Sequence, residues 1–355
     1  MENLLHNIQR LIIPLTFKCN FNCAYCYVCK DNRGDFTEEI LKKIYKLLLI
    51  NNENPDRAIY FFGGEPLLRY DLLQWSISEI EDLARKYQKK IFLAVTTNGL
   101  LLDEEKIKFL TGNFNLVGVS IDNLDPGYAY RNVKSIKEKL PLLLKYQGQD
   151  KILIKMTIMP EFADSFFNSY EMLIRLGFRH INISPILGYF WSSQQSAQFL
   201  ANIKKIIKKS KALQKFGYHL HLKMVEDIKY IINNNKEHCP VLREELAIDT
   251  NGDIYPCQFF VALPEEYRKK YILGNINLSE VNSDLVKKVE DFKICDNDLL
   301  GAQIAKCRTC RPDRSCKKIC YAFNLQENKF DSQILANAWQ LENDFIDVVK
   351  RYYFP

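Results

Sequence analysis

The stretch Cys19-Asn20-Phe21-Asn22-Cys23-Ala24-Tyr25-Cys26 follows an apolar run at residues 11–17 and decides how the rest of the chain is interpreted. It places three cysteines within eight residues, on a loop that leaves a predicted strand. Cysteine thiolates are the usual ligands of iron–sulfur cubes, and four normally complete one. Three thiolates therefore leave one iron with an open position, which can bind the amine and carboxylate of an amino acid-like ligand.

The same thiols allow a second interpretation, a zinc site. Cys29 lies three residues past Cys26, so the loop offers four cysteines, enough to close a tetrahedral structural site. Tetra-Cys spacing of this kind often marks zinc. If the loop instead holds an iron–sulfur cluster, Cys29 is an additional thiol without a ligand role.

The composition is that of a soluble globular protein with room for two domains. Among its 355 residues, 47% are apolar and 26% are charged. The eleven cysteines form two clusters separated by more than 200 residues, and in a chain of this size such clusters favour metal ligands over disulfides. The run at 11–17 is too short to cross a bilayer and has no cleavage site beside it, so no signal peptide is predicted. We expect a cytoplasmic protein in a reducing, anaerobic setting.

A run of lysines contributes part of the net charge of +6. Apolar residues among them are spaced as one helical face, so the lysines are predicted to form its solvated face rather than a docking surface for an acidic partner. No aromatic residues interleave with the run, which gives nucleic-acid binding little support. The lysines are Lys204, Lys205, Lys208, Lys209, Lys211 and Lys215.

Hydrophobic periodicity predicts alternating strands and helices along the first two thirds of the chain. After the run at 11–17, strands are predicted at 57–62, 91–96, 116–121, 152–158 and 178–183. Helices are predicted at 36–50, 70–87, 103–110, 133–146, 165–176 and 194–213. Strands buried on both faces indicate a parallel α/β sheet, either open and doubly wound or a partial barrel. Active sites of such sheets lie at the carboxyl ends of the strands.

Three short motifs fall at those strand ends. Gly63-Gly64-Glu65-Pro66 follows the second strand, where glycines let the backbone approach a ligand and a carboxylate can accept from an ammonium group. Thr97-Asn98-Gly99 ends the third strand and Ser120-Ile121-Asp122 the fourth, with polar groups suited to ribose hydroxyls and a carboxylate. Each motif alone is also consistent with an ordinary loop.

The second cysteine cluster has the spacing Cys307-x2-Cys310-x5-Cys316-x3-Cys320. Upstream of it lie Cys239 and the element Gly252-Asp253-Ile254-Tyr255-Pro256-Cys257. A C-x2-C pair alone is as compatible with a zinc ribbon as with an iron–sulfur site. Cys295 is a further thiol, twelve residues before Cys307.

The cysteine loop and the motifs after it resemble the radical S-adenosylmethionine (SAM) enzymes, and the second cluster resembles their SPASM extension. The resemblance implies a (β/α)6 partial barrel at 1–225 and a SPASM domain with a C-terminal helix at 226–355. It implies a [4Fe–4S] cluster on Cys19, Cys23 and Cys26 whose open iron chelates SAM, and reductive cleavage of SAM to a 5′-deoxyadenosyl radical. The residues then expected around SAM are Tyr25, Gly63, Gly64, Glu65, Asn98, Ser120, Asp122, Arg131 and Ile183.

The same resemblance implies one or two auxiliary [4Fe–4S] clusters in the SPASM domain. The family pattern ends with a further cysteine, and none follows Cys320 here, so the last position of the second auxiliary site is expected to be taken by Cys295, by Asp331 or another oxygen or nitrogen donor, or to stay open. The implied ligands are Cys239, Cys257 and Cys320 for the first cluster, and Cys307, Cys310 and Cys316 for the second.

The function implied is radical modification of a peptide or protein. The product would be a thioether or carbon–carbon crosslink in a ribosomally made peptide, or an epimer if Cys29 or Cys295 returns a hydrogen atom. Only about nine residues precede the first strand, so we expect a separate leader-recognition protein, or a short substrate that needs none. An external electron donor such as flavodoxin or ferredoxin is also expected.

Two alternatives stay open. One is another radical SAM activity, such as sulfatase maturation or small-molecule chemistry. Sulfatase maturases of this family carry an Asp as catalytic base directly after the Cys of the Y-P-C element, and here that position is Gln258, whose amide cannot serve as a base. The other is a non-catalytic zinc protein, which would be colourless when purified without oxygen.

Overall fold

The computed structural model describes residues 8–31, 33–50, 56–124, 136–148, 150–186, 188–233, 245–278, 280–290 and 332–353. The chain forms two compact units. Unit one comprises Met1–Val119, Ala129–Ile152 and Pro240–Asp291, and unit two comprises Ser120–Tyr128, Leu153–Cys239 and Phe292–Pro355. These units mix residues from both sides of the predicted domain boundary at 225/226, and that boundary remains a prediction.

The parallel core of unit one consists of β1 (Arg10–Thr16), β2 (Asp56–Gly63), β3 (Lys90–Thr97) and β4 (Leu116–Ser120), paired in that order. β1 is buried from its second residue to its last. A parallel strand covered on both faces needs a continuous apolar run, which this strand has. The carboxyl ends of parallel strands meet at one edge, so the loops after β1, β2 and β3 are neighbours.

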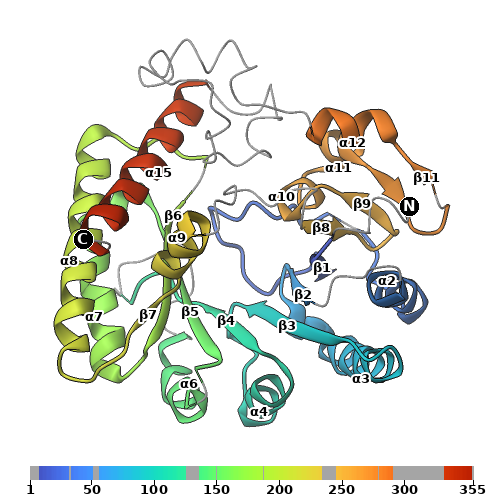
Figure 1. Ribbon diagram of the computed structural model, residues 1–355, viewed down its shortest axis with the longest axis horizontal. Helices are drawn as coiled ribbons and strands as arrows, with labels where there is room; N and C mark the ends of the chain where they lie inside the picture. Colours follow the sequence, from blue (N-terminus) through green and yellow to red (C-terminus); the bar gives the residue numbers. More distant parts are fainter. Residues whose placement is uncertain are drawn as a thin grey trace. The chain divides into compact units, whose positions relative to one another are not determined.

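Helices follow three of these strands and cover one face of the sheet (Figure 1): α2 (Glu38–Ile50), α3 (Tyr70–Lys86) and α4 (Glu104–Asn113). All three confirm the predicted helices to within three residues at each end. α4 begins at a side-chain cap, because the Asp103 carboxylate accepts from the Lys106 N–H at 2.8 Å.

The helix predicted at 133–146 is interrupted in the described residues: residues 136–137 are helical, 138–139 form a turn, and α6 spans Leu140–Tyr146. Residues 133–135 lie outside the described residues. Pro141 stands in the first turn of α6. A proline has no N–H to donate and fits the first turn of a helix but not its interior, so it marks where this helix begins.

Short strands from the C-terminal third of the chain extend the sheet of unit one beyond β1. β8 (Glu245–Ile248) pairs with β1 in parallel, and Arg10 Nη1 lies 3.0 Å from Glu245 Oε2 across that pairing. β9 (Asp253–Tyr255), β10 (Gly274–Asn275) and β11 (Glu280–Val281) continue it in antiparallel pairs. The order is β11-β10-β9-β8-β1-β2-β3-β4. Strands of two to four residues carry too little periodicity to be predicted, and none of these was.

Unit two contains β5 (Ile152–Ile158), β6 (His180–Pro185) and β7 (His221–Leu222), paired in parallel in that order, with α7 (Phe166–Leu176) between β5 and β6. β5 confirms its predicted bounds, whereas β6 starts two residues later than predicted. The reason is local: Gly177 ends α7 with a φ of 108°, and the chain needs the next residues to turn back toward the sheet.

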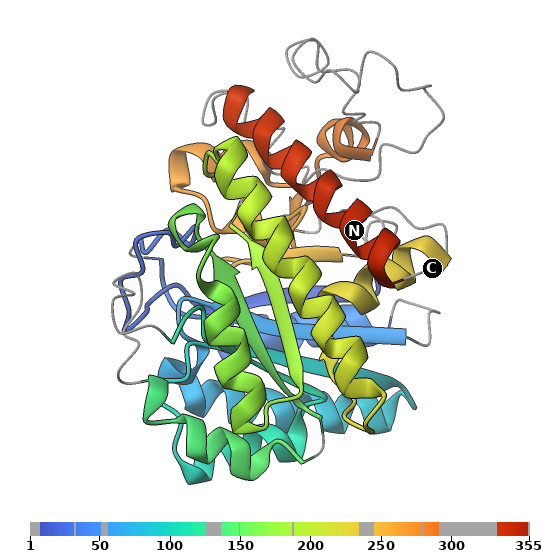
Figure 2. The ribbon, with the colours of Figure 1, turned by 90° about the vertical axis from the view of Figure 1, so that its left-hand side faces the viewer.

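Two long helices of unit two lie side by side, α8 (Ser193–Gln214) and α15 (Ser332–Tyr353) (Figures 1 and 2). Asn337 joins α15 to the residue just before α8. Its Nδ2 donates to the Trp191 carbonyl at 2.6 Å, and its Oδ1 accepts from the Trp191 N–H at 2.7 Å. α8 buries Ile203, Ile206 and Ile207, while Lys205, Lys208 and Lys215 are exposed, which confirms its solvated lysine face. α9 (Lys223–Asn233) follows β7. No helix in the described part of the chain has the length and apolar character to span a membrane.

Candidate functional site

The cysteine loop leaves the carboxyl end of β1 in unit one. Cys19 and Cys23 are half-buried and Cys26 is exposed, and none of the three is in a disulfide. The Cys26 N–H donates to the Cys23 carbonyl at 3.1 Å, which makes a turn, and the Phe21 N–H donates to Cys19 Sγ at 3.4 Å. Burial raises the pKa of the Cys19 thiol, and the Phe21 N–H opposes that rise. Within the described ranges, no three His, Cys, Asp or Glu side chains converge on one metal-binding point.

One carboxylate anchors the base of the loop. Asp35 Oδ1 accepts from the Thr16 hydroxyl at 2.9 Å, and its Oδ2 lies 3.1 Å from Lys18 Nζ and 3.2 Å from Arg69 Nη1. Burial pushes the pKa of Asp35 upward, but the hydrogen bonds from Thr16 and Lys18 outweigh it and hold the pKa below its ordinary value. The start of the loop is thereby tied to the segment in front of α3.

The two glycines after β2 press against the first residues of the cysteine loop. The Gly64 N–H donates to the Thr16 carbonyl and the Glu65 N–H to the Lys18 carbonyl, both at 2.8 Å. A Cβ at Gly63, whose φ is +128°, would lie 2.2 Å from the Thr16 oxygen, and one at Gly64 would lie 2.1 Å from the Lys18 oxygen. Backbone packing thus requires glycine at both positions. Their predicted contact with SAM stays a prediction.

The Glu65 side chain was expected to accept from the ammonium group of a ligand, but it points into the protein interior. It is fully buried, and its Oε1 accepts from the Leu67 N–H at 3.0 Å and the Thr97 hydroxyl at 2.7 Å. Its Oε2 accepts from the Asn98 N–H at 2.7 Å. The carboxylate therefore joins the β2 and β3 loops, and it is not presented to the ammonium group of a ligand. If this motif holds the amino group of SAM, backbone carbonyls must do so.

Asn98, predicted to line the SAM pocket, faces the cysteine loop. Its Nδ2 lies 2.7 Å from Asn20 Oδ1 and 3.7 Å from Cys19 Sγ. Its Oδ1 accepts from the Leu100 N–H at 3.0 Å. The structure thus brings together Cys19, Glu65 and Asn98 in unit one, as the motif positions at neighbouring strand ends predicted.

Other predicted pocket residues belong to unit two. Ser120 ends β4 and Asp122 is buried, with its Oδ1 accepting from the Thr157 N–H at 3.1 Å. Ile183 is 0% exposed, so a ligand at the end of β6 would meet the half-buried Ser184 and Pro185 instead. Tyr25 is half-buried on the cysteine loop of unit one. The predicted residues that lie outside the described ones are Arg131, Cys239, Cys295, Cys307, Cys310, Cys316, Cys320 and Asp331.

Cys257, the one predicted auxiliary ligand that the structure describes, is buried at the start of α10 (Gln258–Val261) in unit one. The second half of the cysteine loop packs on this helix. The Cys29 N–H donates to the Ala262 carbonyl at 2.8 Å, and the rings of Tyr27 and Phe259 lie 4.7 Å apart. The predicted elements of the two cluster sites are therefore in direct contact.

Three charged side chains, here called the arginine clamp (Asp31, Arg33 and Arg268), strengthen that contact. Arg33 Nη1 donates to the Val261 carbonyl at 2.6 Å, and its guanidinium lies 3.5 Å from the centre of the Phe17 ring. Asp31 lies 2.5 Å from Arg33 Nε and 2.8 Å from Arg268 Nη1. No local sequence pattern revealed the clamp, because its members come from segments more than 230 residues apart.

A buried carboxylate lies in the turn between β8 and β9. Asp249 Oδ1 accepts from the N–H groups of Asn251 and Asp253, and its Oδ2 accepts from the Tyr255 hydroxyl at 3.2 Å. Burial raises the pKa of Asp249 to about 6, with the nearby Asp253 charge adding to the rise. These hydrogen bonds fix the strand that leads into Cys257.

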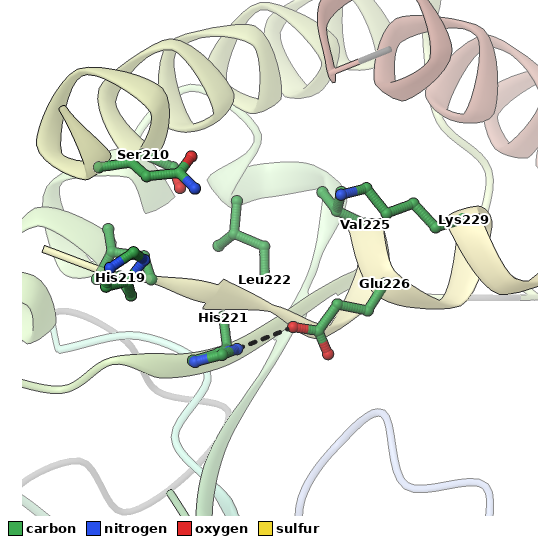
Figure 3. Close-up of a pocket in the computed structure, with 9 residues that line it drawn as sticks. Ser210, His219, His221, Leu222, Val225, Glu226 and Lys229 are labelled. Atoms are coloured by element: carbon green, nitrogen blue, oxygen red, sulfur yellow. Dashed lines mark hydrogen bonds and ion pairs between the residues drawn. The ribbon is translucent and has the colours of Figure 1, made fainter. Parts of the chain in front are cut away.

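A polar cavity of about 150 Å³ lies in unit two and has no counterpart among the sequence predictions. His221 Nδ1 lies 3.1 Å from Glu226 Oε1 at its mouth, drawn as a dashed line in Figure 3. His221 pairs with His180, the first residue of β6, so this cavity is at the amino ends of the strands. Its other lining residues are Ser210, Gln214, His219, Leu220, Leu222, Val225 and Lys229.

Known protein families match two parts of the chain. Residues 13–173 match the radical SAM superfamily, and residues 239–311 match an iron–sulfur cluster-binding domain, SPASM. The chain belongs to the radical SAM superfamily. Its cofactors are accordingly SAM, the [4Fe–4S] cluster that binds SAM, and one or two auxiliary [4Fe–4S] clusters. The cysteine loop supplies the three thiols that such a group needs, and Cys19 Sγ already accepts from the Phe21 N–H.

Relatives of this radical SAM protein extend over nearly its whole length. A cysteine-type anaerobic sulfatase-maturating enzyme of Clostridium perfringens is 25% identical over 381 residues, which cover 98% of this chain and 96% of that protein. The structure of native anSMEcpe with bound AdoMet and Cp18Cys peptide matches with a TM-score of 0.69 at 21% identity, covering 96% of this chain and 99% of that one. Streptococcus suis SuiB bound to the precursor peptide SuiA matches with a TM-score of 0.64 at 16% identity, covering 94% and 77%. These structural matches confirm the α/β partial-barrel fold with a SPASM domain.

Proposed function

We propose that this radical SAM protein modifies a residue of a peptide or protein. When bound, a cluster held by Cys19, Cys23 and Cys26 would, with SAM and one electron from a donor, supply a radical able to remove a hydrogen atom from the substrate. The structural observation that supports a SPASM-dependent reaction is the contact between the cysteine loop and the helix at Cys257, closed by the Cys29–Ala262 hydrogen bond of 2.8 Å. Two structures that share its fold contain peptides, which supports a substrate of that class.

In this proposal the chain's own residues have distinct tasks. Cys19, Cys23 and Cys26 hold the SAM-binding cluster, while Asp35 and the Glu65 carboxylate keep the loops around it in place. Cys257 is a ligand of an auxiliary cluster, and the arginine clamp keeps its helix against the cysteine loop. Cys239, Cys320, Cys307, Cys310 and Cys316 complete the auxiliary ligand sets.

The product we favour is a crosslink, thioether or epimer in a ribosomally made peptide. Gln258 follows Cys257 and stands half-buried at the start of α10. Its side-chain amide has no useful basicity, so it cannot take the proton that oxidation of a Cys or Ser side chain to an aldehyde releases.

We further propose a separate leader-recognition protein and a flavodoxin or ferredoxin as electron donor. The free thiols of the described chain suit the reducing cytoplasm.

Sulfatase maturation is the second candidate. It is supported by the 25% identity to a sulfatase-maturating enzyme across 98% of this chain. The two candidates differ in whether a base is needed next to Cys257, so position 258 separates them.

The test is an anaerobic assay with two kinds of peptide. One is a sulfatase-derived peptide with the Cys or Ser target, and the other is any short peptide encoded beside this gene. We expect 5′-deoxyadenosine from SAM, a mass change in the encoded peptide, and no formylglycine in the sulfatase peptide. Formylglycine formed as fast as SAM is cleaved would establish the maturase activity instead. Gln258→Asp serves as a matched variant that supplies the missing carboxylate.

A further inference from the structure

The Asn98 side chain contacts the cysteine loop. It is 7% exposed, and its Nδ2 lies 2.7 Å from Asn20 Oδ1 and 3.7 Å from Cys19 Sγ. A primary amide carries two N–H donors on one nitrogen, and sulfur is a weak acceptor. One nitrogen can therefore serve both the Asn20 oxygen and the Cys19 sulfur.

The orientation of this amide is set by its neighbours. The Leu100 N–H donates to Asn98 Oδ1 at 3.0 Å, so the oxygen must face Leu100 and the NH2 group must face the cysteine loop. The Asn98 N–H in turn donates to the buried Glu65 carboxylate at 2.7 Å, and Thr97 donates to the same carboxylate. Glu65 thereby holds the β3 turn, and the turn holds the amide.

We propose that Asn98 is a positioning residue that donates an N–H···S hydrogen bond to Cys19 and raises the reduction potential of the cluster bound there. The inference rests on the proposed function, in which Cys19 is a ligand of the SAM-binding cluster. The Phe21 N–H, 3.4 Å from Cys19 Sγ, gives the same sulfur a second donor. Hydrogen bonds to the sulfurs are among the factors that set the potential of such clusters. Donors favour the reduced cluster because it carries one more negative charge.

This role differs from the SAM contact that the T-N-G motif predicted. A SAM contact would act on SAM affinity and be silent when SAM is absent. A hydrogen bond to Cys19 Sγ acts on the cluster itself, with or without SAM. The two roles can therefore be separated by a measurement on the SAM-free protein.

The experiment compares the cluster-loaded wild type with Asn98→Leu, which is similar in size and has no donor. The midpoint potential of the SAM-free protein is measured by anaerobic redox titration followed by electron paramagnetic resonance (EPR), and SAM affinity is measured separately. We expect the potential of Asn98→Leu to shift to more negative values, with SAM affinity retained. Asn113→Leu is the control, because the Asn113 amide donates to the Phe109 carbonyl at the end of α4 and its loss should leave the potential unchanged.

An unchanged potential together with weakened SAM binding would overturn the proposal and make Asn98 a SAM contact. If Asn98→Leu loses its iron, Asn98→Ala takes its place, since it also lacks the donor and adds no charge beside the cluster. Iron lost from both variants contradicts a tuning role. Cys19→Ala identifies the signal in question: if that variant keeps the SAM-responsive cluster, the ligand assignment of the proposed function fails, and with it the role of Asn98.

Discussion

Two regions of this protein gather ionisable side chains at strand ends, and they differ in burial. In unit one, at the carboxyl ends of the strands, the clamp side chains Arg33 and Arg268 are 4% and 7% exposed. In unit two, at the amino ends, His221 and Glu226 line a cavity and are each 45% exposed. An exposed pair can separate into water at little cost, whereas a buried pair must keep its partners.

The difference shows that a cavity is a poorer guide to this site than buried charge. The His221 cavity has a volume of about 150 Å³, yet no motif at the carboxyl ends of the strands contributes to it. The clamp lines no described cavity, yet it ties the cysteine loop to the helix that begins at Cys257. In the clamp, buried charge is placed at high desolvation cost where the contact between these two elements is made.

The largest effect we expect separates cysteines of the same loop. Cys26→Ala should abolish SAM cleavage, because three thiolates are needed to hold a cluster with one open iron. Cys29→Ala should keep most of the activity, since only the Cys29 backbone is seen in a hydrogen bond with the Ala262 carbonyl. The measurement is 5′-deoxyadenosine released from SAM without oxygen. Inactive Cys29→Ala with intact auxiliary clusters would show that the ligand set is wrong.

Next in size is the loss of the clamp. Arg33→Met removes the ion pair with Asp31 and the hydrogen bond to the Val261 carbonyl, and should lower the free energy of unfolding by about 3 kcal/mol. The matched control is Arg85→Met. Arg85 pairs with Asp82 on α3 with both side chains more than 70% exposed, so its loss should cost less than about 0.5 kcal/mol. Equal losses in a denaturant titration would remove the distinction between the two regions.

Asp249 should make the stability of the buried region depend on pH. Its folded-state pKa is raised from 3.8 to about 6, so the folded protein binds the proton more tightly than the unfolded chain. Stability from this group is present at low pH and is lost as the pH rises through 6, by roughly 1 kcal/mol between pH 5 and pH 7. Asp249→Asn should remove that loss and be the more stable form at pH 7. Parallel stability curves for the two proteins would mean that Asp249 does not titrate in this range.

The smallest effect is expected in the cavity of unit two. His221→Ala removes a polar contact with Glu226 that is nearly half exposed, so the free energy of unfolding should change by less than about 0.5 kcal/mol. SAM cleavage and peptide modification should be unchanged. A marked loss of either activity would show that this cavity takes part in the reaction, which would contradict our interpretation.

Elements held by interactions between residues near in sequence could be predicted, whereas those held by distant partners could not. β1 was predictable because a continuous apolar run marks a strand buried on both faces, and β5 because only Lys155 and Thr157 interrupt its apolar residues. β8 to β11 were not, because such short strands are defined by their partners rather than by their own pattern. The sequence of motifs also predicted that Cys19, Glu65 and Asn98 would meet at neighbouring strand ends.

Roles of single side chains were harder to predict than their positions. A carboxylate after two glycines suggested a ligand contact, but two of the three hydrogen bonds that Glu65 accepts come from Thr97 and Asn98, which no local pattern connects to it. The clamp depends on Arg268 meeting Asp31, 237 positions earlier in the chain. Burial and pairing of this kind appear only when the chain is folded.

The central claim is that the cysteine loop holds one cluster with an iron open to SAM. The direct measurement is EPR of the reduced protein, with and without SAM, in the wild type and in a variant with Cys19, Cys23 and Cys26 all changed to Ala. We predict that SAM alters the wild-type spectrum, and that the triple variant retains only signals that do not respond to SAM. A SAM-responsive signal that persists in the triple variant would contradict the account, because the open iron would then belong to another cluster.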